Sequence, residues 1–498
     1  MAKPLRPDSE PSPSGTARTS FFAIFPSVVL PVFLAIVDQT IVATALPGIA
    51  GDLGHVESLA WVVIAYLIAV TVSSPVYGRL GDMLGRRRLM FVALGLGVCG
   101  TIVAAAAPSF DILLVGRVVQ GLGGGGLMTL TQALVGEAVP PRERAKYQGH
   151  LATIALTSNA FGPVVGGLLT EHFGWRSVFL VNTPLWILAI MLVLRLPDRK
   201  GSGEKFSFDF PGLLLYASFT IAVLLGLQYV QKLDSVSIGT ALALLLAAIA
   251  FLVLLVLRER SARAPLFPPT VVSNPSIWRS DGLAACHGAI LVSMITFSPI
   301  YFHVVHGVSI AQTGLLLLPM TVALATGSLA TGRIVSWSGY TAIFPSWGML
   351  VVTLLLASLA LSAPALSAVQ TSLLIGLTAL FMGSVMGVVQ VTVQVSAGQS
   401  MLGTAAATVQ LSRSLGASFG TAAVGTVLFV TMRTMDPQAA EIMTSILERG
   451  GDVAAVSRLA AAQAQSVIGD AFRFGFATMA VFAAISSILA WSIPLRKI

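Results

Sequence analysis

The stretch GRLGDMLGRRRLM, residues 78–90, lies between two apolar runs, 59–77 and 89–107, that are each long enough to cross a bilayer. It is short, punctuated by glycine, and carries one acid and four arginines. Because lysine and arginine gather in the cytoplasmic loops of membrane proteins, we expect this stretch to form a cytoplasmic hairpin between two spans.

The composition of the whole chain also indicates a membrane protein. Of its 498 residues, 55% are hydrophobic and 10% are charged, with a mean hydropathy of +0.87, whereas roughly 25% of the residues of a soluble domain are charged. The net charge of +8 does not indicate a nucleic-acid partner, because the basic residues fall in short loops between apolar runs. Cys99 and Cys286 lie inside apolar runs, so neither is placed for a disulfide or a metal site.

Runs of about 20 apolar residues predict an all-α integral membrane protein with fourteen transmembrane helices. The predicted spans are 22–47, 59–77, 89–107, 111–135, 148–170, 177–194, 211–230, 238–257, 280–303, 312–332, 342–362, 370–394, 403–430 and 474–494. Residues 1–20 are rich in proline and serine and precede a full-length span, so we expect a disordered N-terminus rather than a cleaved signal.

The basic residues predict the orientation in the membrane. An even number of spans places both termini and the 78–90 hairpin on one side, and that side holds 21 of the 29 lysines and arginines. The other side holds six, and Arg117 and Arg413 lie within spans. We therefore expect a multi-pass protein of the cytoplasmic (inner) membrane with both termini cytoplasmic and the lipid bilayer as its surroundings.

A weak internal repeat predicts the domain organisation. GRIVSWSGY at 332–340 resembles the 78–90 hairpin and lies at the corresponding exit of the second span of a later block. The prediction is an N-terminal six-helix half, 21–195, a linker with two extra spans, 196–278, and a C-terminal six-helix half, 279–498, with a long external loop, 431–473. Transporters built from related halves bind substrate between them near the midplane, so we expect a central cavity lined by both.

Four motifs identify the chain as similar to a known family. They are the hairpin GRLGDMLGRRRLM, LLVGRVVQGLGGG at 113–125, SNAFGPVVGG at 158–167 and AIVDQTIVATALP at 35–47. GWRSVFLVNTP at 174–184 and GLLLLP at 314–319 agree with them. The chain resembles the major facilitator superfamily, in its fourteen-helix drug:proton antiporter branch, along nearly its whole length.

This resemblance implies a function as well as a fold. It implies two six-helix halves joined by two extra helices, and proton-coupled export of hydrophobic, often cationic drugs or toxic compounds by alternating access, without a cofactor or metal and as a monomer. No enzyme site is indicated: GLGVCG at 95–100 matches a dinucleotide fingerprint, but no strand precedes it. The alternatives are a dedicated exporter of one metabolite, lipid or siderophore, and a non-transporting receptor or scaffold.

Asp38 and Arg117 are the candidate proton-coupling residues. A charged carboxylate inside a span costs at least about 2.5 to 3.5 kcal/mol, so Asp38 should face protein or a water-filled cavity. At 1.5 Å per residue, Asp38 and Arg117 lie at matching depths, roughly 9 to 14 Å below the outer surface. They could form a switchable pair that responds to protonation, or a permanent ion pair that only fixes helix packing.

The resemblance implies two gating elements. The first is the hairpin, in which the acid engages a neighbouring helix end and an arginine; plain topology is the alternative for its arginines. The second is the Gly-Pro region of the fifth span, as a hinge that seals the cavity or as static close packing. The candidate gating residues are Gly78, Asp82, Gly85, Arg86, Arg87, Gly162, Pro163, Gly166 and Gly167.

Polar and aromatic residues within the spans are candidates for substrate contact, with helix packing as the alternative for each. They are Gln39, Gln120, Asn159, Phe161, Tyr301, Gln390, Gln394, Gln410 and Arg413. Arg413 could bind an anionic group of a substrate or pair with a carboxylate. Asp281 is expected to be interfacial rather than a second proton site. His303 and His306 have no third ligand in the sequence, so a surface-facing polar pair is favoured over a metal site.

Overall fold

The computed structural model describes residues 14–54, 59–196, 208–230, 235–437 and 458–498. In this part of the chain fourteen helices are long and apolar enough to cross a membrane, as the sequence predicts. Apart from an isolated bridge between Tyr340 and Lys497, the described residues form no β-structure. Helix α1 begins at Ser14, inside the segment expected to be disordered, and residues 1–13 lie outside the described residues.

Thirteen of the spans are single helices, and the sixth is formed by the short α6 (Ser177–Leu180) followed by α7 (Thr183–Leu194). The other spanning helices are α1 (Ser14–Leu53), α2 (Ala60–Leu84), α3 (Arg86–Ala105), α4 (Phe110–Ala138), α5 (Pro141–Phe173), α8 (Phe210–Val230), α9 (Ser235–Ser261), α11 (Pro275–His306), α12 (Ile310–Ser338), α13 (Ile343–Ser362), α14 (Ala368–Ala397), α15 (Leu402–Met435) and α17 (Arg458–Ser492). The one-turn helix α10 (Pro269–Val272) precedes α11. Of the predicted external loop 431–473, residues 438–457 lie outside the described part, and α15 and α17 extend into the rest.

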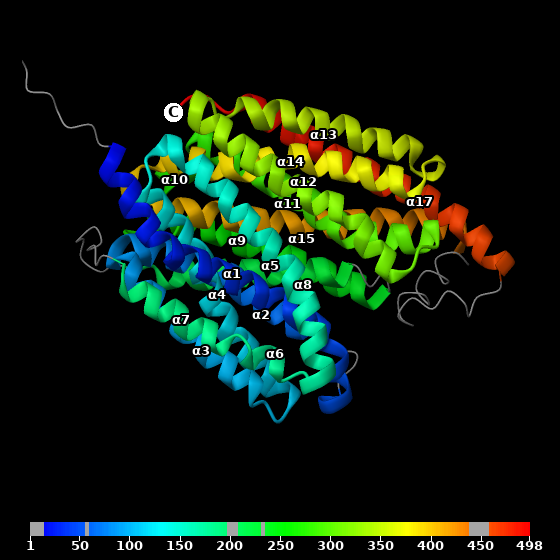
Figure 1. Ribbon diagram of the computed structural model, residues 1–498, viewed down its shortest axis with the longest axis horizontal. Helices are drawn as coiled ribbons and strands as arrows, with labels where there is room; N and C mark the ends of the chain where they lie inside the picture. The colour runs from blue at the N-terminus through cyan, green and yellow to red at the C-terminus, as the bar shows by residue number, and fades with distance from the viewer. Residues whose placement is uncertain (1–13, 55–58, 197–207, 231–234, 438–457) are drawn as a thin grey trace, which may run out of the picture.

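The helices form two sets, α1–α7 (the N-terminal set) and α11–α17 (the C-terminal set), each packed mainly within itself. In Figure 1, α3 and α7 lie along the lower edge of the molecule and α13 lies along the upper edge. The beginning of α1 and the C-terminus lie at the same, left-hand end, as an even number of spans requires. We call this end, which also holds residues 78–90, the hairpin end.

The additional helices α8 and α9 pack against each other, and α8 contacts both α2 and α15. The Tyr216 hydroxyl donates a hydrogen bond of 2.9 Å to the Thr71 carbonyl on α2. Between the two helices, Arg258 near the end of α9 forms an ion pair of 2.9 Å with Asp209, directly before α8. Helices α8 and α9 thus lie beside the contact between α2 and α15, and these last two helices belong to different sets.

Small residues bring the N-terminal helices close together. A Cβ atom on Gly123 of α4 would lie 2.4 Å from the Ala93 carbonyl oxygen of α3, and one on Gly125 would lie 2.4 Å from the Val70 carbonyl oxygen of α2. Close approach of this kind replaces the hydrophobic driving force that is missing between helices in lipid. The glycine run of α4 is therefore a packing surface for α2 and α3.

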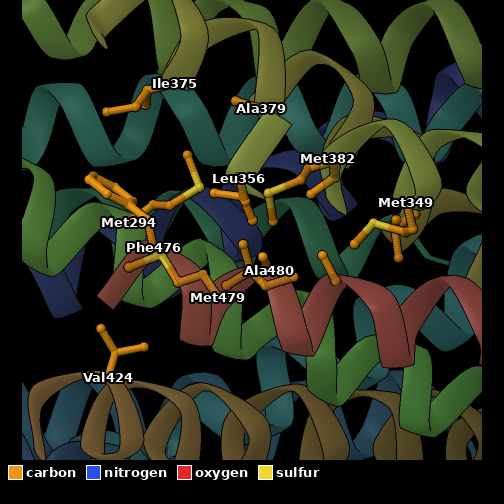
Figure 2. Packing of buried hydrophobic residues seen from close by; sticks show 14 of the residues in the cluster. Met294, Met349, Leu356, Ile375, Ala379, Met382, Val424, Phe476, Met479 and Ala480 are labelled. Carbon is orange, nitrogen blue, oxygen red and sulfur yellow. The ribbon is translucent and has the colours of Figure 1, made fainter. Parts of the chain in front are cut away.

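The C-terminal set has one continuous apolar core. Figure 2 shows its centre, where Met294 of α11, Leu356 of α13, Met382 of α14 and Phe476 of α17 lie around one another. Capping boxes at Ser309 and Ser367 fix the starts of α12 and α14. This core gives the C-terminal set a rigid frame for the residues at its surface.

Candidate functional site

Asp38 and Arg117 are in direct contact in the centre of the N-terminal set. Arg117 Nη1 on α4 donates a hydrogen bond of 3.1 Å to Asp38 Oδ2 on α1, and their side chains are 0% and 1% exposed. Removing two charges from water costs several kcal/mol per ion, so a pair buried this deeply persists only when further hydrogen bonds complete its coordination.

Three more residues form hydrogen bonds with this pair. Gln120 Nε2 donates to Asp38 Oδ1 at 2.6 Å, and Asn182 Nδ2 donates to the same oxygen at 3.3 Å. Gln120 Oε1 accepts a bond of 2.6 Å from Arg117 Nη1, while Arg117 Nε donates to the Val62 carbonyl at 3.0 Å. The carboxylate thus accepts from an arginine and two amides and is held by α1, α4 and the turn before α7.

An aromatic ring covers the cation of this pair. The Arg117 guanidinium carbon lies 4.3 Å from the centre of the Tyr66 ring on α2, which suits a cation–π contact. The Tyr66 hydroxyl donates to the Ala35 carbonyl on α1 at 3.1 Å. Adding a proton to Asp38 would remove the charge that holds α1 to α4, so protonation and the arrangement of these helices are physically linked.

The hairpin acid contacts the opposite set of helices. Asp82 Oδ1 accepts a hydrogen bond of 2.9 Å from the Gly403 backbone N–H, and Oδ2 accepts one of 2.9 Å from the Thr404 N–H and another of 3.2 Å from the Thr404 hydroxyl. Both N–H groups belong to the first turn of α15, where unpaired donors and the helix dipole favour an anion. Arg86 Nη2 donates to Asp82 Oδ1 at 2.9 Å, and its Nη1 bonds Glu137 of α4.

Glycines let α2 and α15 meet at this point. A Cβ atom on Gly78 would lie 2.6 Å from the Gly403 carbonyl oxygen, and one on Gly403 would lie 2.4 Å from the Gly78 carbonyl oxygen. Gly85 has a φ of +95° between α2 and α3, a conformation that L side chains rarely adopt. Arg87 Nη2 donates to the Leu194 carbonyl at 2.9 Å, so it ties the hairpin to the end of α7 within the same set.

The candidate hinge residues of α5 differ in their surroundings. A Cβ atom on Gly162 would lie 2.0 Å from Thr40 Oγ1 of α1, and one on Gly166 would lie 2.3 Å from Thr44 Oγ1. Gly167 has open space at the same position. The side chain of Pro163 lies outside the described residues. Gly162 and Gly166 therefore hold α5 tightly against the part of α1 that carries Asp38, and Gly167 takes no part in this contact.

The two sets are joined at the hairpin end by further contacts. Gln394 Nε2 of α14 donates to the Gln132 carbonyl of α4 at 2.9 Å, and Arg142 Nε of α5 donates to the Ile498 carbonyl at 2.9 Å. Near the middle of α5, Asn159 and Phe161 are exposed, the latter by 55%. In the described part of the chain the hairpin end is thus the closed end.

The candidate substrate residues fall into three groups. Gln39, Asn159 and Phe161 are exposed on α1 and α5, and Gln410 and Arg413 are partly exposed on α15 and joined by a hydrogen bond of 3.2 Å. The other four are buried: Gln120, Tyr301, Gln390 and Gln394.

Three of the buried residues form hydrogen bonds with other parts of the protein and have no open surface. Gln120 bonds Asp38, and Gln394 belongs to the contact between the sets. The Tyr301 hydroxyl donates to the Ala363 carbonyl at 2.7 Å, and its ring packs on Phe472 within the C-terminal core. In this conformation these contacts favour helix packing, the alternative to substrate contact, for all three residues, and their contact with substrate stays a prediction.

The remaining titratable candidates are isolated from this network. Asp281 Oδ1 of α11 accepts a long bond of 3.4 Å from the Thr408 hydroxyl. His303 Nδ1 contacts the Val308 carbonyl at 2.8 Å, and the His306 ring packs against Tyr301. No group of three or more potential metal ligands occurs among the described residues. A surface hollow of about 390 Å³ lies beside Asp52, away from Asp38.

Sequence reasoning missed three partners in these networks: Asn182, Glu137 and Thr404. Asn182 stands inside the quoted motif GWRSVFLVNTP, but its side chain reaches Asp38 only because α6 and α7 are separated by a turn. Glu137 lies at the end of the fourth span, close to the hairpin arginines. An acid at that position could have been predicted from the sequence to pair with one of them.

Comparisons with known proteins agree with the fold and these motifs. The family model of the Major Facilitator Superfamily matches residues 28–421. An uncharacterized MFS-type transporter of Mycobacterium tuberculosis is 32% identical over 425 residues, which are 85% of this chain and 61% of that protein. The multidrug transporter protein MdtP of Bacillus subtilis is 29% identical over 405 residues, 80% of this chain and 74% of MdtP. The chain thus spans less than two thirds of the mycobacterial relative.

Solved structures share the fold at low sequence identity. The proton:xylose symporter XylE superposes with a TM-score of 0.62 at 14% identity, covering 96% of this chain and 97% of XylE. The human organic anion transporter MFSD10 gives a TM-score of 0.62 at 16% identity, covering 94% and 99%. With the family match over most of its length and fourteen candidate spans in its described part, this chain belongs to the Major Facilitator Superfamily.

Proposed function

We propose that this transporter exports hydrophobic, often cationic drugs or toxic compounds across the cytoplasmic membrane in exchange for protons, with its hairpin end facing the cytoplasm. The observation that carries the proposal is the sealed network of Asp38, Arg117, Gln120 and Asn182 inside the N-terminal set. Two relatives in Bacillus subtilis are named as multidrug proteins, MdtP and multidrug resistance protein 3, at 29% and 27% identity.

Asp38 is suited to carry the proton because its two protonation states have opposite effects on the helices. The carboxylate binds Arg117 and two amides, whereas the neutral acid leaves the arginine as an uncompensated buried charge. Protonation therefore favours an arrangement in which Arg117 finds other partners. A proton and a cargo that prefer different arrangements of α1 and α4 compete through one conformational equilibrium, which is the physical requirement for exchange.

The hairpin contacts supply the second requirement, a closed end that can reopen. The carboxylate of Asp82 on the first turn of α15 is a directional contact between the sets that involves few atoms. In the proposed cycle it forms when the cytoplasmic end closes and breaks when the cargo enters from that side. We propose that the protein works as a monomer, because the residues of both networks come from one chain.

The driving force depends on the charge of the cargo. Exchange of one proton for one monovalent cation moves no net charge, so the pH difference alone drives about tenfold accumulation per unit. A neutral cargo also uses the voltage, worth about 2.3 kcal/mol per 100 mV.

Proton movement in everted vesicles tests this proposal. With an acid interior, a panel of lipophilic cations and neutral drugs is added, and dequenching of a pH-sensitive dye is recorded for wild type, Asp38→Asn and Asp52→Asn. The last variant is a matched control, since Asp52 lies on the same helix but its side chain is 51% exposed and bonds Arg176.

The expected result is dequenching by several unrelated compounds in wild type and Asp52→Asn, and none in Asp38→Asn. An equal response in Asp38→Asn would place the proton on another residue. If the wild-type protein is inserted in the membrane but no compound of the panel causes dequenching, the result would favour the dedicated exporter of one metabolite, lipid or siderophore.

A further inference from the structure

Arg413 places a positive charge inside one span of the C-terminal set. Arg413 lies eleven residues after the start of α15, which is roughly 17 Å along the helix and near the middle of a 30 Å hydrocarbon core. Its Nη2 donates to Gln410 Oε1 at 3.2 Å. Its Nε and Nη1 have no hydrogen-bond partner among the described residues, yet neither is among the buried polar atoms that lack a partner. The Arg413 side chain as a whole is partly exposed.

A partly exposed arginine at this depth is not expected to face lipid. An arginine held toward hydrocarbon in the middle of a span costs at least about 2.5 to 3.5 kcal/mol, so such residues face the interior of the bundle or a water-filled cavity. The backbone of Arg413 is fixed against α11, because a Cβ atom on Gly288 would lie 2.3 Å from the Arg413 carbonyl oxygen. The Arg413 side chain thus extends from a backbone that is fixed on α11.

No acid within the described residues neutralises Arg413. Asp281 accepts from the Thr408 hydroxyl and lies nearer to the hairpin end. The Asp82 carboxylate accepts hydrogen bonds from the first turn of α15, including one from the Thr404 backbone N–H. A guanidinium of this kind presents a planar fork of donors that matches a carboxylate.

The opposite charge in the N-terminal set cannot compete for cargo in this conformation. The Asp38 side chain is 1% exposed and is surrounded by Arg117, Gln120 and Asn182. On α11, His287 is 3% exposed and has no partner for its Nδ1 atom, and it lies near enough to Arg413 to experience its charge. It adds a polar group to this region without adding a negative charge.

We propose that Arg413, positioned by Gln410, forms a site that binds an anionic group of the cargo, most simply a carboxylate, so that hydrophobic compounds carrying both a cationic and an anionic group are bound better than their purely cationic analogues. This inference concerns the cargo class of the proposed exporter and rests on that function. The conservative lysine keeps the charge but loses the fork, so it should restore only part of the preference.

Rhodamine B and its ethyl ester test the site, because they share one cationic hydrophobic ring system and differ in whether the carboxylate is free. Binding of each dye to the purified full chain is measured by fluorescence anisotropy without any gradient, for wild type, Arg413→Gln, Arg413→Lys and Arg433→Gln. Arg433 lies on the exposed end of the same helix and is the matched control.

Wild type and Arg433→Gln are expected to bind the acid about tenfold or more tightly than the ester, because a hydrogen bond between charged groups is lost in the ester. Arg413→Gln should abolish this ratio by weakening the acid alone. Equal binding of both dyes to wild type, no binding of the acid, or an unchanged ratio in Arg413→Gln would overturn the inference. Proton-driven flux of the same dyes is measured separately in proteoliposomes, so loss of flux with the binding ratio intact counts against the exporter and not against the site.

Discussion

Replacing Asp82 by asparagine should open the hairpin end. The carboxylate accepts hydrogen bonds from the backbone N–H groups of Gly403 and Thr404, at 2.9 Å each, and its side chain is 3% exposed, so solvent screens these bonds little. Asparagine has nearly the same size but has one acceptor oxygen and no charge. The substitution therefore weakens contacts that exist only while α2 and α15 are together.

The size of this effect follows from the two bonds. A hydrogen bond to a charged group contributes roughly 1.5 to 3 kcal/mol and a neutral one roughly 0.5 to 1.5 kcal/mol, so the change costs about 1 kcal/mol per bond, and somewhat more because one acceptor is lost. A total of about 2 to 3 kcal/mol corresponds to a roughly 30- to 140-fold shift of the equilibrium toward the open hairpin end.

Cysteine labelling measures this shift. Val391 of α14 is 0% exposed and packs with Ala145 and Val335 between the sets, so Val391→Cys, made in a background with Cys99 and Cys286 replaced by serine, reacts with a maleimide only when the hairpin end opens. When opening is fast relative to labelling, the rate is proportional to the open population.

In this assay Asp82→Asn should label roughly 30-fold faster or more. The matched control is Asp52→Asn, whose residue bonds Arg176 at the opposite end, and it should leave the rate unchanged. If Asp82→Asn and its parent label at the same rate, the carboxylate does not hold the two sets together, and the hairpin serves topology alone.

Three further predictions follow from other contacts. Gly162→Ala places a methyl group 2.0 Å from a threonine hydroxyl of α1 and should lower the free energy of unfolding by about 1 to 3 kcal/mol, whereas Gly167→Ala meets open space and should be neutral, as measured by thermal unfolding in detergent. Gly403→Leu should prevent α2 and α15 from meeting and raise the maleimide labelling rate as the loss of the hairpin acid does; an unchanged rate would show that the helices separate elsewhere. Asn182→Ala removes one donor to Asp38 and should weaken proton-coupled flux without abolishing it, and complete loss of flux in a folded protein would mean that the amide has a larger role than support.

The fold was predictable because two signals act over long stretches. Runs of apolar residues are required to cross hydrocarbon, and basic residues mark the loops between them. The helix ends were less predictable: α17 begins at Arg458 rather than near 474, because hydropathy detects the part of a helix inside the bilayer while polar residues can continue the same helix outside it.

The contact of Asp38 with Arg117 was accessible from the sequence because both are lone charges in apolar helices and the rise per residue sets their depth. The direction in which uncharged side chains point was not accessible. Tyr301 and Gln394 stand in helices that are apolar on every side, so nothing in the sequence distinguishes a packed core or a contact between sets from a cavity wall. Asp82 could be assigned to a helix end only through the family resemblance, since Gly403 is more than 300 residues away.

Proton release on cargo binding tests the central claim most directly. The purified protein is placed in a weakly buffered solution with a pH-sensitive dye, and a lipophilic cation is added to wild type, Asp38→Asn and Asp281→Asn. If Asp38 carries the coupled proton, wild type and Asp281→Asn release protons on binding, and Asp38→Asn binds the cation without any release. Release that persists in Asp38→Asn and disappears in Asp281→Asn would contradict the account and assign the coupled proton to the C-terminal set.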